Sequence, residues 1–397
     1  MAPEMLFFCP MKTIQTPLLI NSNEQLATLC QQLANSQWLA LDTEFMREKT
    51  YSPQFCLLQI ATTDCVACID PLEIESLDPL LDLIYRTDIV KIFHASRQDL
   101  EIFFNLRGAI PAPIFDTQIA APLLGHADQI GYANLVKALL NIELPKTHSR
   151  TDWSHRPLSP EQLTYAADDV IYLAQIYKAM SEQLTKLGRL EWLENDFEAL
   201  TQNSLYENSP ELAWNRIRSA WKLKGDSLSS LQLLAEWRET QAQKSNRPRN
   251  WILKDDALFD IARQRPDSID KLKRVRGIPE QTVRRQGEAI LDLLDAATKR
   301  APIPAKTPQK TSKKSAEKEA LLDILMSVTR IYAEQEKINP TTLASRKELE
   351  RLLNQPNEST LLNGWRKSII GEKLLHFLDG SQSLSVKNNK VILEKTK

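Results

Sequence analysis

The sequence predicts an α/β domain that is followed by two small all-α domains. Short apolar runs of strand length alternate with helical patterns over roughly the first 200 residues. The remainder shows helical patterns almost throughout, and a stretch rich in proline and lysine divides it in two. The length of 397 residues allows this organisation, since it is enough for two to four domains.

The charge of the chain is divided unevenly between its halves. The 50 Lys and Arg nearly balance the 51 Asp and Glu over the whole sequence. Residues 1–210, however, hold 27 acidic and 14 basic side chains, a net charge of −13, whereas residues 211–397 hold 24 and 36, a net charge of +12. This asymmetry predicts an acidic module joined to a basic one that binds a polyanion. The hydrophobic fraction of 42% is enough to bury cores and argues against wholesale disorder.

The strands and helices of the first half follow from apolar patterns. Four short apolar runs have the length of strands: Trp38–Asp42, Phe55–Ala61, Asp64–Asp70 and Ile89–Phe93. Leu77–Tyr85 and Gln98–Leu106 have the spacing of helices. Sheets covered by helices place their functional sites at strand ends, where several acidic residues of this sequence fall.

A further helix is predicted to begin at Pro160. Ser159 is a favourable N-cap, Pro160 suits the first helical position, and Gln162 completes a capping box. Tyr165 and Asp169 lie four residues apart on this helix and therefore share a face. Asp168 lies three residues from Tyr165, so geometry alone leaves the choice between the two aspartates open.

The second half is predicted to hold two helical domains, at 211–297 and 318–397. Helical patterns occur at 227–243, 254–263 and 280–294, and a strand is suggested only near 390–393. Residues 298–317, with three prolines and many lysines, form a flexible basic linker between the domains. The two domains resemble each other faintly, because Pro248–Leu258 and Ile338–Leu349 share a turn-then-helix pattern.

Residues 1–12 are predicted to be an N-terminal tail before a domain at 13–210. The tail has no basic region of the kind that starts a signal peptide, and no run of about 18 apolar residues predicts a membrane span. Five cysteines in so long a chain make no disulfide framework and predict a reducing, cytoplasmic location. Cys65 and Cys68 form a single C-x-x-C, which we interpret as buried cysteines of a strand, and the five histidines lack metal-ligand spacing.

Acidic residues from three predicted elements carry the chemistry. Asp42 and Glu44 are two residues apart at the end of a strand, so both side chains point to the same face. Asp99 begins a helix, and the helix from Pro160 carries the fourth acidic residue, Asp168 or Asp169. Bare anions at close range repel one another, but divalent cations relieve this. Carboxylate oxygens suit Mg²⁺ or Mn²⁺, and two such ions about 4 Å apart clamp the attacking and leaving oxygens of a phosphodiester.

Each of these residues has a simpler explanation when it is taken alone. A D-x-E pair is mostly surface charge, an aspartate like Asp99 is commonly a helix N-terminal acid, and a tyrosine like Tyr165 is usually part of a core. Only their ordered combination predicts a site, in which the Tyr165 hydroxyl would orient a water molecule in line with phosphorus.

That combination resembles the three exonuclease motifs of the DEDD superfamily, in its tyrosine-bearing branch. The stretches LDTEFMREKTYSPQFCLLQIA, HASRQDLEIF, FDTQIAAPLLG and SRTDWSHRPLSPEQLTYAADDVIYL are similar to the ribonuclease D family, and the resemblance runs from about residue 14 to 200. It implies a ribonuclease-H-like exonuclease domain with a mixed central sheet and two divalent cations, Mg²⁺ or Mn²⁺. It also implies the roles of individual residues: Asp42, Glu44, Asp99 and Asp169, rather than Asp168, as metal ligands, and Tyr165 as the residue that positions the water.

The basic half resembles HRDC domains, of which the family has two. The first, near 211–295, is the clearer match and the second is divergent. Four cations ahead of Gly277 are predicted to contact nucleic acid, with a solvated charged face as an equal alternative: Lys271, Lys273, Arg274 and Arg276. Arg156 is expected to bind either a substrate phosphate or a structural carboxylate, with equal weight on both. Asp116 is expected either to cap a helix or to support the metal ligands from behind.

The resemblance implies a 3′→5′ exoribonuclease that releases nucleoside 5′-monophosphates and trims structured RNA ends, notably those of tRNA precursors. We expect the protein to be a monomer. A DNA 3′→5′ exonuclease is the first alternative, because proofreading domains share the four carboxylates and no motif reads a 2′-hydroxyl. A non-catalytic RNA-binding protein is the second. The complete set of acidic ligands argues against it.

Overall fold

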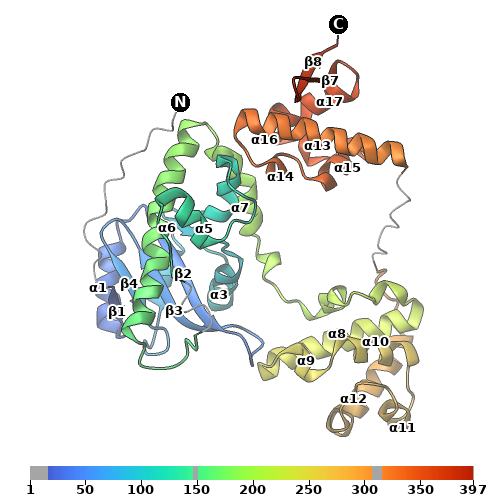
Figure 1. Ribbon diagram of the computed structural model, residues 1–397. Coiled ribbons are helices and arrows are strands. Elements are labelled where there is room, and N and C mark those ends of the chain that lie inside the picture. Colours follow the sequence, from blue (N-terminus) through green and yellow to red (C-terminus); the bar gives the residue numbers. More distant parts are fainter. Residues whose placement is uncertain (1–16, 146–150, 306–314, 397) are drawn as a thin grey trace. The chain divides into compact units, whose positions relative to one another are not determined.

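The computed structural model describes residues 17–145, 151–305 and 315–396, which divide into two compact units. Unit 1 comprises residues 1–44, 56–202 and 313–397, and unit 2 comprises residues 45–55 and 203–312. Figure 1 shows the α/β part in blue and green and the helices of unit 2 in yellow and tan. The predicted tail and much of the predicted linker lie outside the described residues.

A six-stranded mixed sheet forms the centre of the α/β part of unit 1. Its strands lie in the order β1-β4-β3-β2-β5-β6, with β1 parallel to β4, β4 antiparallel to β3, and β2, β5 and β6 parallel. Their bounds are β1 (Leu18–Ile20), β2 (Trp38–Met46), β3 (Gln54–Ala61), β4 (Val66–Ile69), β5 (Val90–Phe93) and β6 (Ile114–Asp116). The four predicted strands are confirmed as β2 to β5, and β2 continues beyond its predicted end at Asp42.

The helices of this part include the predicted ones, at α2 (Asp78–Ile84), α3 (Arg97–Arg107) and α6 (Pro160–Lys186). The capping box predicted at Ser159 and Gln162 is present at the start of α6. Figure 1 shows α6 running along the sheet, where it contacts β4 and β5. The other helical elements are α1 (Asn23–Leu33), α4 (Thr117–Ala120), η1 (Ala121–Leu124), α5 (Tyr132–Leu140), η2 (Leu190–Leu193) and α7 (Glu194–Leu200).

Unit 2 is a helical unit with its own core. Its helical segments are η3 (Asn203–Leu205), η4 (Pro210–Arg216), η5 (Ala220–Lys222), α8 (Gly225–Ser245), α9 (Arg249–Ile252), α10 (Asp255–Gln264), α11 (Ile269–Lys273) and α12 (Glu280–Thr298). The three helical patterns predicted from the sequence are confirmed as α8, α10 and α12. Trp214 is buried in this core, whereas Trp221 remains 39% exposed.

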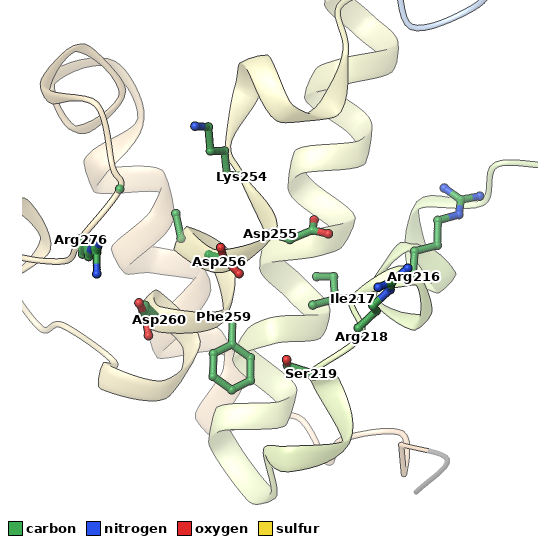
Figure 2. A pocket seen from close by; sticks show the side chains of 12 residues that line it. Arg216, Ile217, Arg218, Ser219, Lys254, Asp255, Asp256, Phe259, Asp260 and Arg276 are labelled. Atoms are coloured by element: carbon green, nitrogen blue, oxygen red, sulfur yellow. The ribbon is translucent and has the colours of Figure 1, made fainter. Parts of the chain in front are cut away.

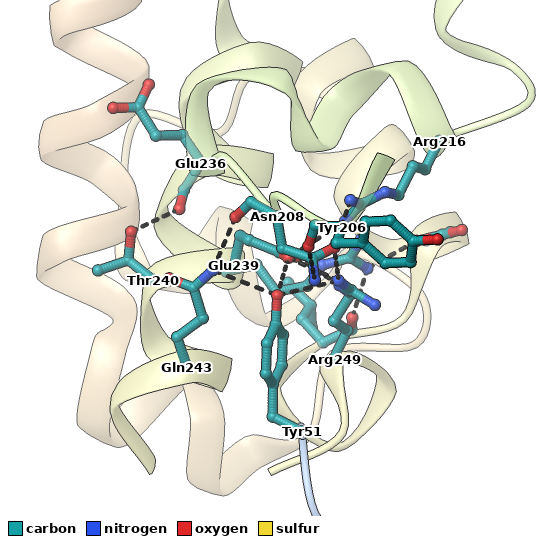
Figure 3. Close-up of polar contacts among 12 residues, drawn as sticks. Tyr51, Tyr206, Asn208, Arg216, Glu236, Glu239, Thr240, Gln243 and Arg249 are labelled. Atoms are coloured by element: carbon teal, nitrogen blue, oxygen red, sulfur yellow. Dashed lines mark hydrogen bonds and ion pairs between the residues drawn. The ribbon is translucent and has the colours of Figure 1, made fainter. Parts of the chain in front are cut away.

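The segment between β2 and β3 also belongs to unit 2. The Tyr51 hydroxyl donates to Glu239, and Tyr51 accepts hydrogen bonds from Arg249 at 3.0 Å and Gln243 at 3.2 Å, as Figure 3 shows. The Arg249 guanidinium lies 4.8 Å from the centre of the Tyr51 ring. Asn246 accepts the main-chain N–H groups of Tyr51 and Ser52. We call this set of partners, Glu239, Gln243, Asn246 and Arg249, the Tyr51 socket.

The C-terminal segment contains three helices whose lengths are close to those of α8, α9 and α10 in unit 2. It comprises α13 (Ala316–Glu336), α14 (Pro340–Leu343), α15 (Arg346–Asn354), η6 (Pro356–Glu358), η7 (Thr360–Leu362), α16 (Gly364–Arg366), a π-helical turn at Lys367–Gly371 and α17 (Glu372–Leu378). Helices α8, α9 and α10 have 21, 4 and 10 residues, and α13, α14 and α15 have 21, 4 and 9. A left-handed residue ends the first helix of each set, Asn246 and Lys337.

This C-terminal segment packs within unit 1. Its buried side chains share one hydrophobic cluster with the sheet and α6. Arg189 donates to the main-chain oxygens of Leu123 and Glu336 at 2.9 and 2.7 Å, and the rings of Trp192 and Trp365 stack at 4.6 Å. A hairpin of β7 (Gln382–Lys387) and β8 (Lys390–Lys395) follows α17, where the sequence suggested a strand.

Among the described residues, no helix is both long and apolar enough to cross a lipid bilayer.

Candidate active site

Three of the predicted metal ligands meet at one point. Asp42 and Glu44 lie on β2 and Asp169 lies on α6, and each offers a carboxylate oxygen such that all three atoms are within 4.8 Å of one another. The alternation of a strand puts Asp42 and Glu44 on one face, and α6 brings Asp169 to that face. The i, i+2 spacing that the sequence singled out therefore does bring the two carboxylates together.

Asp99 lies beside this group and is held by Thr43. Asp99 is in the first turn of α3, is 7% exposed, and accepts a hydrogen bond from the Thr43 hydroxyl. Thr43 stands between Asp42 and Glu44 in β2, so this bond ties the fourth acid to the strand that carries the first two. Asp99 is outside the group of three, but its charge contributes to the raised pKa of Glu44.

Tyr165 lies one turn before Asp169 on α6. Its ring is 6.2 Å from that of Trp153, which is buried. Partial burial, followed by the charges of Asp169, Glu44 and Asp42, raises the pKa of the Tyr165 phenol well above its ordinary value. The hydroxyl therefore stays protonated at neutral pH.

The carboxyl groups are strongly perturbed by burial and by one another. Burial raises the pKa of Asp42 to about 6. Burial, with the charges of Asp42, Asp169 and Asp99, raises the pKa of Glu44 to about 9. Burial, with the charges of Asp42 and Asp168, raises the pKa of Asp169 to about 9. The protein alone thus holds protons here that a cation would displace.

This donor set fits a divalent cation. All its members are hard carboxylate oxygens from rigid elements, which is the ligand type that Mg²⁺ and Mn²⁺ prefer. Burial is the main cause of the raised pKa values, and the repulsion that adds to it at Glu44 and Asp169 is energy that a bound cation would relieve. No further group of three acidic, histidine or cysteine side chains within such a distance occurs in the parts of the chain that the structure describes.

Asp116 organises the approach to Asp99, a role that the sequence left open. Its buried carboxylate accepts the main-chain N–H groups of Ala95 and Ser96 at 3.1 and 2.8 Å, and it caps α4 by accepting from Gln118 at 2.8 Å. Residues 95 and 96 lead into α3. Asp116 therefore fixes the loop from which the helix of Asp99 starts, in addition to being a helix cap.

Arg156 is used within the fold. It donates to both carboxylate oxygens of buried Asp70, at 2.5 and 2.8 Å, and to the main-chain oxygens of Trp153, His155 and Cys56. A guanidinium has five N–H donors, and these contacts engage all of them. The structure thus favours the structural alternative over a phosphate contact.

The cysteines of the C-x-x-C lie in and beside β4. Cys68 is buried and Cys65 is partly exposed, and both are free thiols. Burial raises the pKa of Cys68 to about 12, which disfavours the thiolate that a metal ligand or redox nucleophile requires. Cys9 and His148 lie outside the described residues.

The four predicted nucleic-acid cations of unit 2 are exposed on α11 and the turn after it. Lys271 and Lys273 form exposed ion pairs with Asp267 and Asp270. Arg276 instead lines a pocket of unit 2. Exposed ion pairs contribute little energy, so both lysines remain available to an anionic ligand.

Comparisons with known proteins agree with this geometry. The family described as "3'-5' exonuclease" matches residues 17–185, and the HRDC domain matches residues 227–294. Ribonuclease D of Sphingobium indicum is 38% identical over 386 residues, which cover 95% of this chain and 98% of that protein. Ribonuclease D of Gluconacetobacter diazotrophicus is 38% identical over 378 residues, which cover 94% and 96%.

A solved structure extends the likeness to the whole fold. The crystal structure of Escherichia coli RNase D, described as an exoribonuclease involved in structured RNA processing, matches with a TM-score of 0.78 at 31% sequence identity. The match covers 92% of this chain and 99% of that one. The carboxylate group, the exonuclease and HRDC matches and the relatives along almost the full length all agree. The chain therefore belongs to the ribonuclease D family of 3′→5′ exoribonucleases.

Proposed function

We propose that this protein shortens RNA from its 3′ end by hydrolysis and releases nucleoside 5′-monophosphates. The observation that carries the proposal is the meeting of Asp42, Glu44 and Asp169, with Asp99 tied to the same strand through Thr43. In this proposal the four carboxylates hold two divalent cations, Mg²⁺ or Mn²⁺. Bound there, the cations would activate the attacking water and neutralise charge on the phosphate.

Side chains of the protein position the reacting phosphate and the attacking water. The carboxylates of β2 and α6 would hold the cations that bind the reacting phosphate. The Tyr165 hydroxyl, which burial and neighbouring acids keep protonated, hydrogen-bonds the attacking water and orients it in line with phosphorus. Buried Asp116 holds the start of α3, so that Asp99 keeps its place during turnover.

The test uses the full chain with 5′-labelled RNA and matched DNA, in Mg²⁺ or in EDTA. We expect a ladder of shortened RNA that EDTA abolishes. Asp42→Ala and Asp169→Asn should each slow the reaction by about 1,000-fold or more, since a lost cation ligand removes several kcal/mol of transition-state stabilisation.

Asp168→Asn is the matched control, because it removes the same charge from the adjacent residue of α6, and we expect near-normal activity. Equal shortening of DNA would instead assign the protein as a DNA exonuclease. Binding of RNA without shortening would leave a non-catalytic RNA-binding protein.

We also propose that unit 2 binds the RNA backbone, partly in a pocket beside Arg276. Arg218, Lys254 and Arg276 line this pocket, whose volume is about 700 Å³, and all three side chains are exposed; Figure 2 shows them among the other lining residues. Of the acids that line the same pocket, Asp255 pairs with Arg238 and Asp260 with Arg263. Lys271, Lys273 and Arg274 would extend this surface.

A triple variant tests the surface. Arg218→Ala, Lys254→Ala and Arg276→Ala together should reduce by about 2 the slope of log affinity against log salt, since each lost contact with a single-stranded phosphate removes about 0.7. The control combines Lys244→Ala, Arg285→Ala and Lys299→Ala, exposed cations of unit 2 that do not line the pocket. Equal slopes for the two triple variants would refute the assignment of this pocket.

We further propose the domain division predicted from the sequence, with an exonuclease domain at 13–210, HRDC-like domains at 211–297 and 318–397, and a linker at 298–317. The matching helix lengths and spacings of α8–α10 and α13–α15 support a second HRDC-like domain. We propose a cytoplasmic monomer that acts on tRNA precursors or other structured RNA 3′ ends. The likeness to Escherichia coli RNase D, which is involved in structured RNA processing, supports this substrate class.

A further inference from the structure

A second tyrosine reaches the helix that carries Asp169. Tyr132 is the first residue of α5 and is partly buried. Its hydroxyl donates to the main-chain oxygen of Asp169 and lies 3.3 Å from that of Asp168. Tyr132 lies outside the stretches that resemble the exonuclease motifs, and 37 residues separate it from Asp169.

The position of this contact within α6 is unusual. Asp169 is the tenth residue of a 27-residue helix, so its main-chain oxygen lies in the interior of α6 and far from either end. The main-chain N–H of Leu173, one turn later in α6, also bonds to the Tyr132 hydroxyl. The Tyr132 side chain of α5 therefore binds the turn of α6 that carries the Asp169 carboxylate.

Neighbouring residues hold the ring of Tyr132 and its helix in place. Its ring lies 5.4 Å from the ring of His94, at the end of β5. The Nδ1 atom of His94 is 2.9 Å from the Thr117 hydroxyl, which donates to the main-chain oxygen of Phe93. Helix α5 also buries Leu135 and Val136 in the hydrophobic cluster that contains the buried face of α6. The Tyr132 hydroxyl is therefore positioned by a packed helix, α5, rather than by a loop.

We infer that Tyr132 is a positioning residue for Asp169, which holds the turn of α6 at the distance from β2 that the carboxylate group requires. This inference rests on the proposed function. The oxygens of Asp42, Glu44 and Asp169 lie within 4.8 Å of one another. Ligand groups of this kind tolerate displacements of only about 0.5 Å, and loss of a contact that orients a ligand costs about 10- to 100-fold in metal affinity or activity.

The experiment replaces Tyr132 with Phe, which keeps the ring and its packing and removes the hydroxyl. Binding of Mn²⁺ to the full chain without RNA is measured by calorimetry, and kcat and KM are measured with a short single-stranded RNA at a subsaturating metal concentration. We expect Mn²⁺ binding and kcat each to fall by about 10-fold, and KM to stay within about twofold.

Tyr85→Phe is the matched control. The Tyr85 hydroxyl is also partly buried and also donates to two main-chain oxygens of unit 1, those of Phe103 at 2.8 Å and Ala109 at 3.1 Å. It touches none of the three clustered carboxylate residues. We expect Tyr85→Phe to lower the melting temperature without a change in Mn²⁺ affinity.

Two results would overturn the inference. Normal Mn²⁺ affinity and kcat in Tyr132→Phe would show that the contact positions nothing. Equal losses of Mn²⁺ affinity in both variants would show a general structural effect of removing a buried hydroxyl. Failure of the wild-type chain to shorten RNA would refute the proposed function instead, and the Mn²⁺ titration would still decide the role of Tyr132.

Discussion

At neutral pH the carboxyl groups of Glu44 and Asp169 hold protons in the folded protein that they would lose on unfolding, and Asp42 does so only below about pH 6. The raised pKa values, about 6 for Asp42 and about 9 for Glu44 and Asp169, exceed those of unfolded chains. A raised carboxyl pKa gives stability that is complete below the unfolded pKa and is lost as the pH rises through the folded pKa. The relevant window therefore runs from about pH 4 to about pH 9.

We predict that the melting temperature of metal-free protein falls across this window and that Mg²⁺ restores it. The increase in melting temperature on addition of Mg²⁺ should be small at pH 5 and largest near pH 9. The reason is that the cation replaces protons, which the carboxyl groups have lost at high pH. Differential scanning calorimetry with Mg²⁺ or EDTA at several pH values measures the gain. The gain should vanish in a variant that combines Asp42→Asn, Glu44→Gln and Asp169→Asn. A gain independent of pH in the wild type would contradict this account.

Asp116→Asn should destabilise unit 1 by about 1–3 kcal/mol, since it leaves buried main-chain N–H groups facing a side-chain amide. Ala95 and Gln118 bond one carboxylate oxygen and Ser96 bonds the other, so either orientation of asparagine opposes a donor to a donor. Urea denaturation measures the loss. Asp128→Asn removes the same charge from an exposed position and should have almost no effect. Comparable stability of the two variants would show that Asp116 does not hold this loop.

Residue type and spacing placed Asp42 and Glu44 on one face of a strand, but only the resemblance to the exonuclease motifs selected Asp169 over Asp168. Residue type and spacing are local properties. They could not predict the partners of individual side chains. Arg156 was open between phosphate and protein because its partner, Asp70, lies 86 residues away, and Tyr132 carried no signal at all. Contacts between residues so distant in the chain depend on tertiary packing, which local patterns do not record.

At the scale of elements, the tip of the segment between β2 and β3 is held by the Tyr51 socket. Tyr51→Phe should destabilise unit 2 by about 1.5–3 kcal/mol, because hydrogen bonds to charged groups are strong and the Glu239 side chain is fully buried. Chemical denaturation, followed by a probe in unit 2, measures this loss. A double-mutant cycle with Glu239→Gln should show coupling between the two substitutions. Strictly additive losses would mean that the hydroxyl and the carboxylate act independently.

The π-helical turn before α17 depends on Gly371. A Cβ atom there would lie 2.1 Å from the main-chain oxygen of Leu361, which cannot move aside alone. Gly371→Ala should therefore cost about 1–3 kcal/mol or more, measured by thermal unfolding. Gly287→Ala is the comparison, because its Cβ would meet the flexible end of the Ile269 side chain at 2.7 Å and alanine favours the helix. A smaller loss for Gly371→Ala than for Gly287→Ala would contradict this explanation.

The elements themselves were largely predictable. Apolar periodicity located β2 to β5 and the helices α8, α10 and α12, and capping chemistry located the start of α6. Strand β1, with three residues and two exposed leucines, carries too little pattern to be recognised. The end of β2 was placed too early because Asp42 and Glu44 break the apolar run, although function requires them within the strand.

At the scale of the whole molecule, the division of charge predicts how binding responds to salt. The affinity for a structured RNA of tRNA size should fall steeply with salt, by about 0.7–0.9 in log affinity per log salt for each phosphate contact. A trinucleotide, which offers only two internucleotide phosphates, should show a much shallower slope. Filter binding and competition at several salt concentrations measure both slopes. Equal slopes would mean that the basic half does not contact the RNA.

The assignment of residues 45–55 to unit 2 has a consequence for how such proteins diversify. Recombination can exchange a domain freely when a single linker joins it to the rest of the chain. Here a loop between two sheet strands is part of the helical unit that begins some 150 residues later. A gene fragment that encodes the sheet alone would leave Tyr51 without its partners, and a foreign helical domain would have to supply a replacement socket. The nuclease and its first helical unit are therefore expected to be inherited together.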